Sequence, residues 1–340
     1  MAAKELRISS LTAMPKELTT GYIKGIESHF GTFDIPIVLA NGGHDGPILS
    51  LTAVVHGNEI SGIEIIRQVL RKRVNIGELH GSVVAVPVCN PLAFIWREHA
   101  SPQDHANMAM VFPGDPNASL TRRLANKIWT EVLLKSQYNV DLHHCGWPGI
   151  PYAYCKSEIA RNEETGRRSV EMAKAAGLTI IHQGKDAFWG PGIWGSLTDA
   201  TMMNGIPSVT IELNVPRDRI FKEVVEVGVR SVLNVMKYLK MIPGQIEKHS
   251  SEVPIVPGEF VMKAAKFPRT TRGGIMVMEK EPGRFVQRGE TIATVYNVFG
   301  EKLEEVKMTV DGYIWAHSHS ALVYEGDKAV IGIFAEWQSQ

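Results

Sequence analysis

A histidine and a glutamate stand three residues apart in the segment Val55-His56-Gly57-Asn58-Glu59, which joins an expected strand to an expected helix. At such a corner the imidazole of His56 and the carboxylate of Glu59 can reach one point. Zinc in proteins is bound by histidine nitrogens and carboxylate oxygens, and a catalytic zinc has three protein ligands and one open position. His-x-x-Glu is a common pattern, however, and these residues could equally form a helix start beside a buried histidine.

The segment Asp141-Leu142-His143-His144 closes a second expected strand. Because the carboxyl ends of parallel strands meet at one edge of a sheet, we expect His143 to join the first two groups. Strand alternation puts Asp141 on the same face as His143, where its carboxylate would orient the imidazole. His144 could be the ligand instead. We take His143 as the ligand and place His144 in the pocket.

Glu212 lies in a third apolar strand pattern, Ser208–Leu213. A carboxylate in a buried strand is costly unless it is paired or used. At the end of the strand it could accept a proton from a water that attacks a substrate. An ion pair with Arg217 or Arg219, just downstream, would explain the residue about as well.

These three segments belong to a longer alternation of strand-like and helix-like stretches. Strand patterns are expected at residues 48–55, 82–88, 138–142 and 208–213, and helical spacing at residues 59–73, 120–134 and 219–239. The alternation predicts an α/β fold with a mixed, largely parallel sheet flanked by helices. After Met241, prolines and glycines recur between short strand patterns. This arrangement predicts a smaller all-β C-terminal domain. We expect a catalytic domain at residues 1–245 and a β-barrel or sandwich-like domain at residues 250–340.

The composition is that of an ordinary globular protein. Of the 340 residues 44% are hydrophobic, and 36 basic side chains balance 36 acidic ones, so the formal net charge is zero. A neutral chain without a basic run disfavours nucleic-acid binding. No stretch approaches the roughly 20 apolar residues of a membrane helix. The three cysteines, Cys89, Cys145 and Cys155, form no disulfide framework and are expected to be buried thiols. We expect a soluble, cytoplasmic protein.

The motifs, in this order, resemble the succinylglutamate desuccinylase/aspartoacylase family of the zinc carboxypeptidase-like superfamily. The matching pieces span most of the chain: Gly46-Pro47, His56-Gly57-Asn58-Glu59, Asn90-Pro91-Leu92-Ala93-Phe94, Phe112-Pro113-Gly114, Asp141-Leu142-His143 and Thr210-Ile211-Glu212. The resemblance implies a zinc carboxypeptidase-like fold with one Zn²⁺ per chain held by His56, Glu59 and His143. It also implies that Glu212 is the general base for the attacking water.

The segment that should bind the substrate departs from the family. The family carries Asn-Arg shortly before Phe-Pro-Gly, where this chain has Ala109-Met110. An upstream arginine that helps to polarise the scissile carbonyl is also expected. Here His99 falls at that position and Arg97 lies two residues before it, so either side chain could act.

We expect Asn90, Met110, His144 and Arg217 to contact the substrate, with Arg217 as a relocated partner for a carboxylate. Since Met110 cannot bind a carboxylate as an arginine does, a more apolar or aromatic substrate is expected. Large apolar residues near the motifs would line such a pocket, although they could equally form core: Trp96, Met108, Phe112, Trp147, Trp189 and Trp194.

The sequence thus predicts a zinc-dependent hydrolase that cleaves the amide bond of an N-acylated small molecule. Two alternatives stay open. One is a non-catalytic, metal-binding relative of the family, suggested by the missing Asn-Arg pair. The other is a metal-dependent esterase, which would use the same residues. The expected partner is a small N-acyl substrate, with neither nucleic acid nor membrane, and the chain could also form a homo-oligomer.

Overall fold

The computed structural model describes residues 4–29, 31–144, 146–182, 195–214, 218–249, 253–262, 267–318, 320–330 and 333–336. Its strands, in chain order, are β1 (Leu6–Ile8), β2 (Leu11–Ala13), β3 (Glu17–Ser28), β4 (Gly31–Asn41), β5 (His44–Ala53), β6 (His80–Val86), β7 (Tyr138–His143), β8 (Tyr152–Cys155), β9 (Thr179–His182), β10 (Ser208–Glu212), β11 (Glu259–Met262), β12 (Gly274–Met278), β13 (Phe285–Val286), β14 (Thr291–Tyr296), β15 (Lys302–Lys307), β16 (Gly312–Ile314), β17 (Leu322–Val323) and β18 (Ile333–Glu336). The helices are α1 (Ser61–Gln68), α2 (Pro91–Trp96), α3 (Leu120–Glu131), α4 (Glu163–Ala176), α5 (Leu197–Met203) and α6 (Lys222–Tyr238).

A twelve-stranded mixed sheet runs through the molecule in the order β13-β16-β18-β11-β9-β8-β10-β7-β5-β6-β4-β3. Its central neighbours β6, β5, β7 and β10 are parallel, and so are β8, β9 and β11. The hairpin of β3 and β4 adds an antiparallel edge. The predicted α/β class with helices around a mixed sheet is therefore confirmed. The elements that were expected by range, β5, β6, β7, β10, α1, α3 and α6, begin and end within about five residues of the expected bounds.

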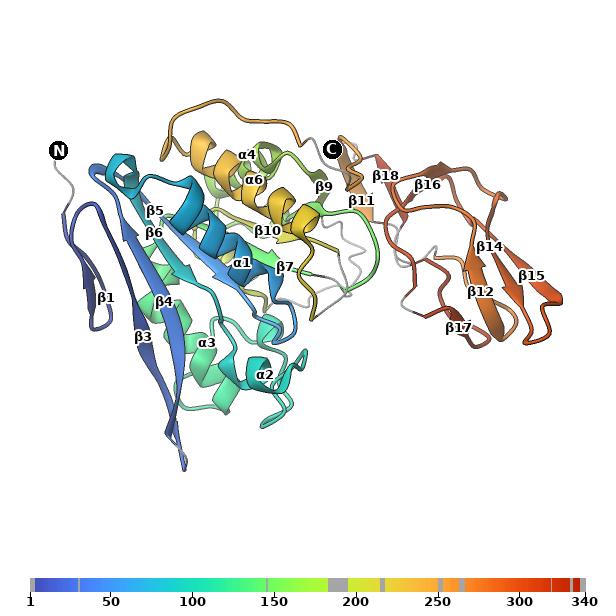
Figure 1. Ribbon diagram of the computed structural model, residues 1–340, viewed down its shortest axis with the longest axis horizontal. Helices are drawn as coiled ribbons and strands as arrows, with labels where there is room; N and C mark the ends of the chain where they lie inside the picture. The colour runs from blue at the N-terminus through green and yellow to red at the C-terminus, as the bar shows by residue number, and fades with distance from the viewer. Residues whose placement is uncertain are drawn as a thin grey trace.

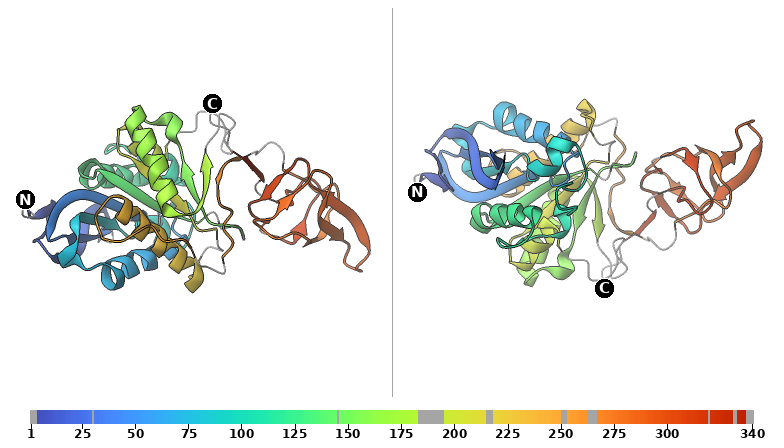
Figure 2. Two further views of the ribbon diagram at one scale, coloured as in Figure 1. Left: turned by 90° about the horizontal axis from the view of Figure 1, so that it is seen from above. Right: turned by 90° about the horizontal axis from the view of Figure 1, so that it is seen from below.

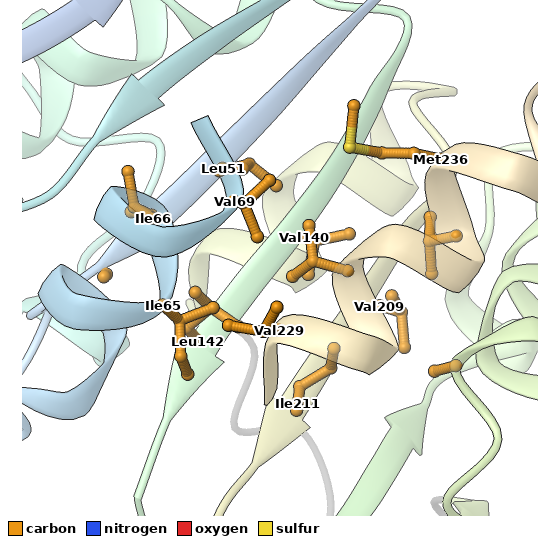
Figure 3. Close-up of a cluster of buried hydrophobic side chains, with 14 of the residues drawn as sticks. Leu51, Ile65, Ile66, Val69, Val140, Leu142, Val209, Ile211, Val229 and Met236 are labelled. Atoms are coloured by element: carbon orange, nitrogen blue, oxygen red, sulfur yellow. The ribbon is translucent and has the colours of Figure 1, made fainter. Parts of the chain in front are cut away.

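Helices cover both faces of the central strands. On one face α1, α4 and α6 pack against aliphatic side chains of the strands, as Figure 3 shows for Leu51, Val140 and Ile211 with Ile65 and Val229. α1 and α6 lie side by side on this face (Figure 1). On the other face α2, α3 and α5 contribute to a second apolar cluster. Burial of these two clusters from water is what fixes the strand ends in place.

Strand alternation gives the same central strands a polar face. β5, β7 and β10 point their aliphatic residues toward α1, α4 and α6, so the alternate residues face the other way. These alternate residues are largely buried although they are polar: Ser50, Thr52, Asn139, Asp141, His143, Ser208 and Thr210. Buried polar groups need hydrogen-bond partners. Some of these partners lie within the layer, as for Thr52 with Asp141, and others lie on α5, as for Thr210 with Thr198.

The C-terminal residues form a smaller sheet of four antiparallel strands in the order β15-β14-β12-β17. Its apolar cluster also includes Val286 of β13 and Ile314 of β16, at the end of the large sheet. In Figure 1 these strands lie in one lobe with β16 of the large sheet, and Figure 2 shows this lobe to one side of the helix-covered part. The chain does not separate cleanly after residue 250, because β11 pairs with β9 and the large sheet continues through β18, β16 and β13. The predicted division at residues 245–250 stays a prediction.

The junction between the two parts is apolar and aromatic. Trp315 is buried there with Tyr152 and Phe260, and its indole nitrogen donates a hydrogen bond of 3.2 Å to the carbonyl of Ile150. Over the described ranges, no helix is long and apolar enough to cross a membrane.

Candidate functional site

Three adjacent strand ends form the base of the candidate site. β5, β7 and β10 run parallel, and the register places Glu212, the last residue of β10, beside His143, the last residue of β7. His56 follows the end of β5 by three residues, and Glu59 stands just before α1. The structure therefore brings together all four residues that the sequence nominated for metal binding and for the base.

Gly57 makes the corner between His56 and Glu59 sterically feasible. A Cβ at this position would lie 2.1 Å from the backbone carbonyl carbon of Ala93, much closer than a real contact. Only glycine lets the corner approach α2 so closely.

Glu59 is the centre of the cluster. Glu59 is only 1% exposed, and each of its carboxylate oxygens lies close to one imidazole. Nδ1 of His56 lies 2.9 Å from Oε1, and Nδ1 of His143 lies 3.0 Å from Oε2. The backbone N–H of His144 also donates to Oε2, at 3.0 Å. The two histidines thus present the same ring nitrogen to one carboxylate.

The far side of the His143 ring is held by the polar layer of the sheet. Nε2 of His143 lies 2.9 Å from Oδ2 of Asp141, and the hydroxyl of Thr52 donates to Oδ1 of Asp141 at 2.7 Å. Asp141 accordingly has the orienting position that strand alternation predicted. Thr52, on the neighbouring strand, was not predicted, although its place in the alternating pattern of β5 could have indicated it.

The far side of the His56 ring is held by a loop residue. Nε2 of His56 lies 3.1 Å from Oδ1 of Asn107, and the imidazole of His99 stacks on the ring, with 3.7 Å between centroids and 18° between planes. Nδ1 of His99 lies 3.8 Å from Oε1 of Glu59. Sequence reasoning missed Asn107, because nothing in its neighbourhood shows a periodic or metal-ligand pattern.

Electrostatics reinforce the geometry. Burial raises the pKa of Glu59, but the charge of His56 and the hydrogen bonds from His143 and His56 outweigh burial and hold that pKa well below its ordinary value. Burial lowers the pKa of His143, whereas the carboxylates of Asp141 and Glu59 raise it and prevail. The cluster is a charged one, stabilised by mutual contact rather than by solvent.

The donor set fits a divalent metal ion. Two imidazole nitrogens and a carboxylate converge, and the remaining ring nitrogens have partners of their own. His56, Glu59 and His99 each offer a ligand atom within 4.8 Å of the others. Nitrogen and carboxylate donors of this kind suit zinc, which needs its ligands deprotonated and would displace the protons that now join the groups. Nδ1 of His143 reaches the other oxygen of the same carboxylate, at 3.0 Å. Glu59 and His56 can therefore be completed by either His99 or His143, and the sequence predicts His143.

Of the two candidates for polarising a carbonyl, the structure brings His99 to the cluster. Arg97 is exposed and ends α2 in the left-handed conformation, with φ of 55°. Among the described residues no hydrogen bond or ion pair joins Arg97 to the cluster. His99, two residues on, is half-buried against His56.

Asn90, for which a substrate contact was predicted, is buried at the start of α2, and the substrate contact stays a prediction. It is 0% exposed and caps α2, accepting a hydrogen bond from the backbone N–H of Ala93 at 3.1 Å. Its Oδ1 also accepts from the hydroxyl of Ser101, and its amide donates to the carbonyl of Val55. This geometry makes Asn90 a support for the corner that carries His56. Asparagine before proline is the pattern of a helix start, so the sequence held a signal for this role.

His144 is likewise buried and supports the corner. Its Nε2 accepts a hydrogen bond of 3.2 Å from the backbone N–H of Ser61, the first residue of α1. Met110 is 51% exposed at the end of a 3₁₀ turn (Met108–Met110). Arg217 lies outside the described residues.

Most of the large apolar candidates do not form one surface. Met108 and Phe112 are buried in the apolar cluster with α3, so they belong to the core. Trp96 is exposed, and Trp147 packs edge-on against Trp315 at the junction with the C-terminal strands. Trp189 and Trp194 lie outside the described residues.

The described cysteines have no features of a nucleophile. Cys89 is buried beside the site, and burial, followed by the charge of Asp141, raises its pKa well above the ordinary value. Burial likewise raises the pKa of Cys155 to about 12. A thiol that stays protonated neither attacks nor binds metal. Cys145 lies outside the described residues.

Known proteins share this architecture. One relative, the N-alpha-acetyl-L-2,4-diaminobutyric acid deacetylase of Halomonas elongata, is 26% identical over 324 residues, which cover 92% of this chain and 89% of the relative. A solved succinylglutamate desuccinylase/aspartoacylase from Rhodobacter sphaeroides has a TM-score of 0.77 at 24% identity and covers 95% of this chain and 96% of its own.

A third similar protein is the product-bound ectoine utilization protein EutE (DoeB) of Ruegeria pomeroyi. Its TM-score is 0.77 at 21% identity, with 93% of this chain and 95% of that chain covered. The two structural likenesses show the fold. Residues 45–239, which carry the whole His56, Glu59, His143 and Glu212 set, match the succinylglutamate desuccinylase/aspartoacylase catalytic domain. The chain belongs to the succinylglutamate desuccinylase/aspartoacylase family.

Proposed function

We propose that the protein is a zinc-dependent hydrolase that cleaves the amide bond of an N-acylated small molecule, with an N-acyl amino acid as the first candidate. The observation that carries the proposal is the approach of two imidazole Nδ1 atoms to the two oxygens of Glu59, at 2.9 and 3.0 Å, beside Glu212 on the adjacent strand. The fold alone would not support a chemistry, because folds host many functions.

His56, Glu59 and His143 would hold the zinc ion. When bound, zinc supplies Lewis-acid chemistry, polarising a carbonyl and acidifying water. Glu212 is the general base in this proposal: its carboxylate takes a proton from the attacking water and returns it to the leaving nitrogen. Its position at a strand end, half-buried and in register with His143, keeps it close to the ligands.

We assign His99, rather than Arg97, the role of hydrogen-bond donor to the scissile carbonyl. A donor aimed at a developing oxyanion contributes to rate rather than to metal binding. His99→Phe keeps a ring against His56 but removes the donor, so we expect kcat to fall by about 10²–10³-fold with zinc affinity unchanged. A loss of zinc in this variant would make His99 a ligand instead.

The experiment that tests the function is a hydrolysis panel on zinc-loaded protein. It includes N-alpha-acetyl-L-2,4-diaminobutyrate, the compound named for the Halomonas relative, together with N-acetylaspartate, N-succinylglutamate, apolar N-acyl amino acids and matched esters. Amide turnover that disappears with a chelator supports the proposal. Turnover confined to esters favours the esterase, and no turnover of any compound favours a non-catalytic relative. Turnover confined to the small dianionic compounds would refute the apolar pocket.

A further inference from the structure

His56 has two ring nitrogens, and only one that carries a lone pair can bind a metal ion. Nδ1 faces Glu59 and Nε2 faces Oδ1 of Asn107, 3.1 Å away. The identity of the metal-binding nitrogen therefore depends on what Asn107 does with Nε2.

A second contact of Asn107 fixes the direction of that hydrogen bond. The backbone N–H of Ala109 donates to the same Oδ1 atom, at 2.9 Å. A backbone N–H can only donate, so the atom that faces it must be the amide oxygen. An amide oxygen has two lone pairs and no hydrogen, so Nε2 of His56 must donate to the second lone pair. Nδ1 is then the nitrogen that can offer a lone pair to a metal.

Asn107 is itself held rigidly enough to impose this choice. It caps the 3₁₀ turn formed by Met108–Met110, and Met108 is fully buried in the core. On the other side of Asn107, the backbone N–H groups of Ala106 and Thr121 donate to Asp104. The amide oxygen thus stands on an anchored loop rather than on a mobile one.

The two histidines of the cluster differ in their outer partners. Nε2 of His143 is hydrogen-bonded to the carboxylate of Asp141, whereas Nε2 of His56 is hydrogen-bonded to the neutral amide of Asn107. A hydrogen-bonded carboxylate makes an imidazole a stronger metal ligand. A hydrogen-bonded amide oxygen fixes the tautomer of the imidazole but, being neutral, strengthens it less as a ligand.

We infer that Asn107 is a positioning residue that sets the tautomer of His56, so that Nδ1 is the nitrogen offered to the metal ion. The inference rests on the proposed function in that it takes zinc as the ion. In this role Asn107 acts through its hydrogen bond with His56 and is not itself a ligand of the metal ion.

The test measures zinc affinity, by competition with a chelator, in the full-length chain and three variants. Asn107→Leu removes the acceptor, and we expect about 10–100-fold weaker zinc binding, the range seen when such outer partners are lost. Asn107→Asp keeps both acceptor contacts and should bind zinc at least as tightly as the wild type. Asn75→Leu is the matched control, because Asn75 caps another 3₁₀ turn (Ile76–Glu78) in the same way, by accepting from the N–H of Gly77.

A second readout follows the tautomer directly. In the zinc-loaded wild type, ¹⁵N NMR should show hydrogen on Nε2 of His56 and none on Nδ1, and Asn107→Leu should lose or broaden the protected Nε2 hydrogen signal. Asn107→Asp should restore it. Thermal unfolding of the zinc-free variants shows whether the Leu variant folds.

The possible outcomes distinguish a failure of the proposed function from a failure of the inference about Asn107. Wild-type protein that binds no zinc overturns the proposed function, and the inference with it. Wild-type protein that binds zinc, with Asn107→Leu equal to it in affinity and NMR signal, overturns the inference alone. Loss of zinc in both Asn107 variants also overturns it, since the aspartate keeps the acceptor. If the Leu variant fails to fold, the aspartate variant and the wild-type tautomer decide: hydrogen on Nδ1 of His56 in either refutes the assignment.

Discussion

Two regions of the molecule are stabilised in opposite ways. One is the polar region at the ends of β5, β7 and β10, and the other is the four-stranded C-terminal sheet. At the strand ends, buried charged and polar groups hold one another through short contacts centred on Glu59. The C-terminal sheet instead depends on an apolar cluster around Ile292 and Val295, and its outer surface leaves Phe299 and Tyr324 largely exposed. The difference implies that substitutions in the first region change chemistry, whereas those in the second change stability.

The largest effect is expected at the centre of the polar cluster. Glu59→Gln keeps the size of the side chain but removes its charge, so it should lose zinc far beyond the roughly 10–100-fold cost of losing an outer partner. Metal analysis of the purified protein measures this loss. Glu64→Gln is the control, because Glu64 pairs with Arg67 on the surface of α1 and should leave the zinc content unchanged. Equal zinc in Glu59→Gln and wild type would remove Glu59 as a ligand.

A change at Glu212 should separate catalysis from binding. Glu212→Gln removes the base but no ligand, so we expect turnover to fall by about 10²–10⁴-fold while zinc content stays at the wild-type level. Steady-state kinetics on the best substrate of the panel provide the measurement. Full activity in this variant would mean that another group moves the proton.

The outer partners of His143 should have graded effects. Asp141→Asn leaves the side-chain size but weakens the support of Nε2, and zinc affinity should fall by about 10–100-fold. Thr52→Val removes only the hydroxyl that donates to Asp141, so its effect should be smaller, about 1 kcal/mol of binding free energy. Chelator competition compares the two variants. A larger loss in Thr52→Val than in Asp141→Asn would contradict the arrangement.

The smallest effect on the site should come from the C-terminal sheet. Ile292→Ala empties part of its cluster and should lower the free energy of unfolding by about 3 kcal/mol, without changing zinc affinity. Phe299→Ser, at an 85% exposed position, is the matched control and should change stability by less than about 0.5 kcal/mol. Urea denaturation and chelator competition test both. Zinc affinity that falls with Ile292→Ala would show that the C-terminal sheet supports the site.

Much of this arrangement follows from local patterns in the sequence. Alternation in β5, β7 and β10 predicts which residues share a face, and that places Asp141 beside His143 and sets Glu212 at a strand end. The corner at His56 and Glu59 follows from a strand pattern that ends where a helix pattern starts. These elements are predictable because each depends on residues that are close in the chain.

The contacts that were not predicted join residues far apart in the chain. Asn107 reaches His56 across 51 residues from an irregular loop, which has no periodicity to show where its side chain points. The same limit applies to the extension of the large sheet through β11, because strand pairing between distant segments leaves no mark on either segment alone. Asn90 is a different case, because asparagine directly before proline is a helix-capping pattern that the sequence itself shows.

The central claim is that His56, Glu59 and His143 bind one zinc ion. The ligand atoms would be Nδ1 of each histidine and the carboxylate oxygens of Glu59, which face one another in this structure. A crystal structure of the zinc-loaded protein, with the metal located by anomalous scattering at the zinc edge, tests it most directly. We predict one zinc per chain, bonded to Nδ1 of His56, Nδ1 of His143 and the carboxylate of Glu59. A zinc ion bonded to other residues, or to Nε2 of either histidine, would contradict the account.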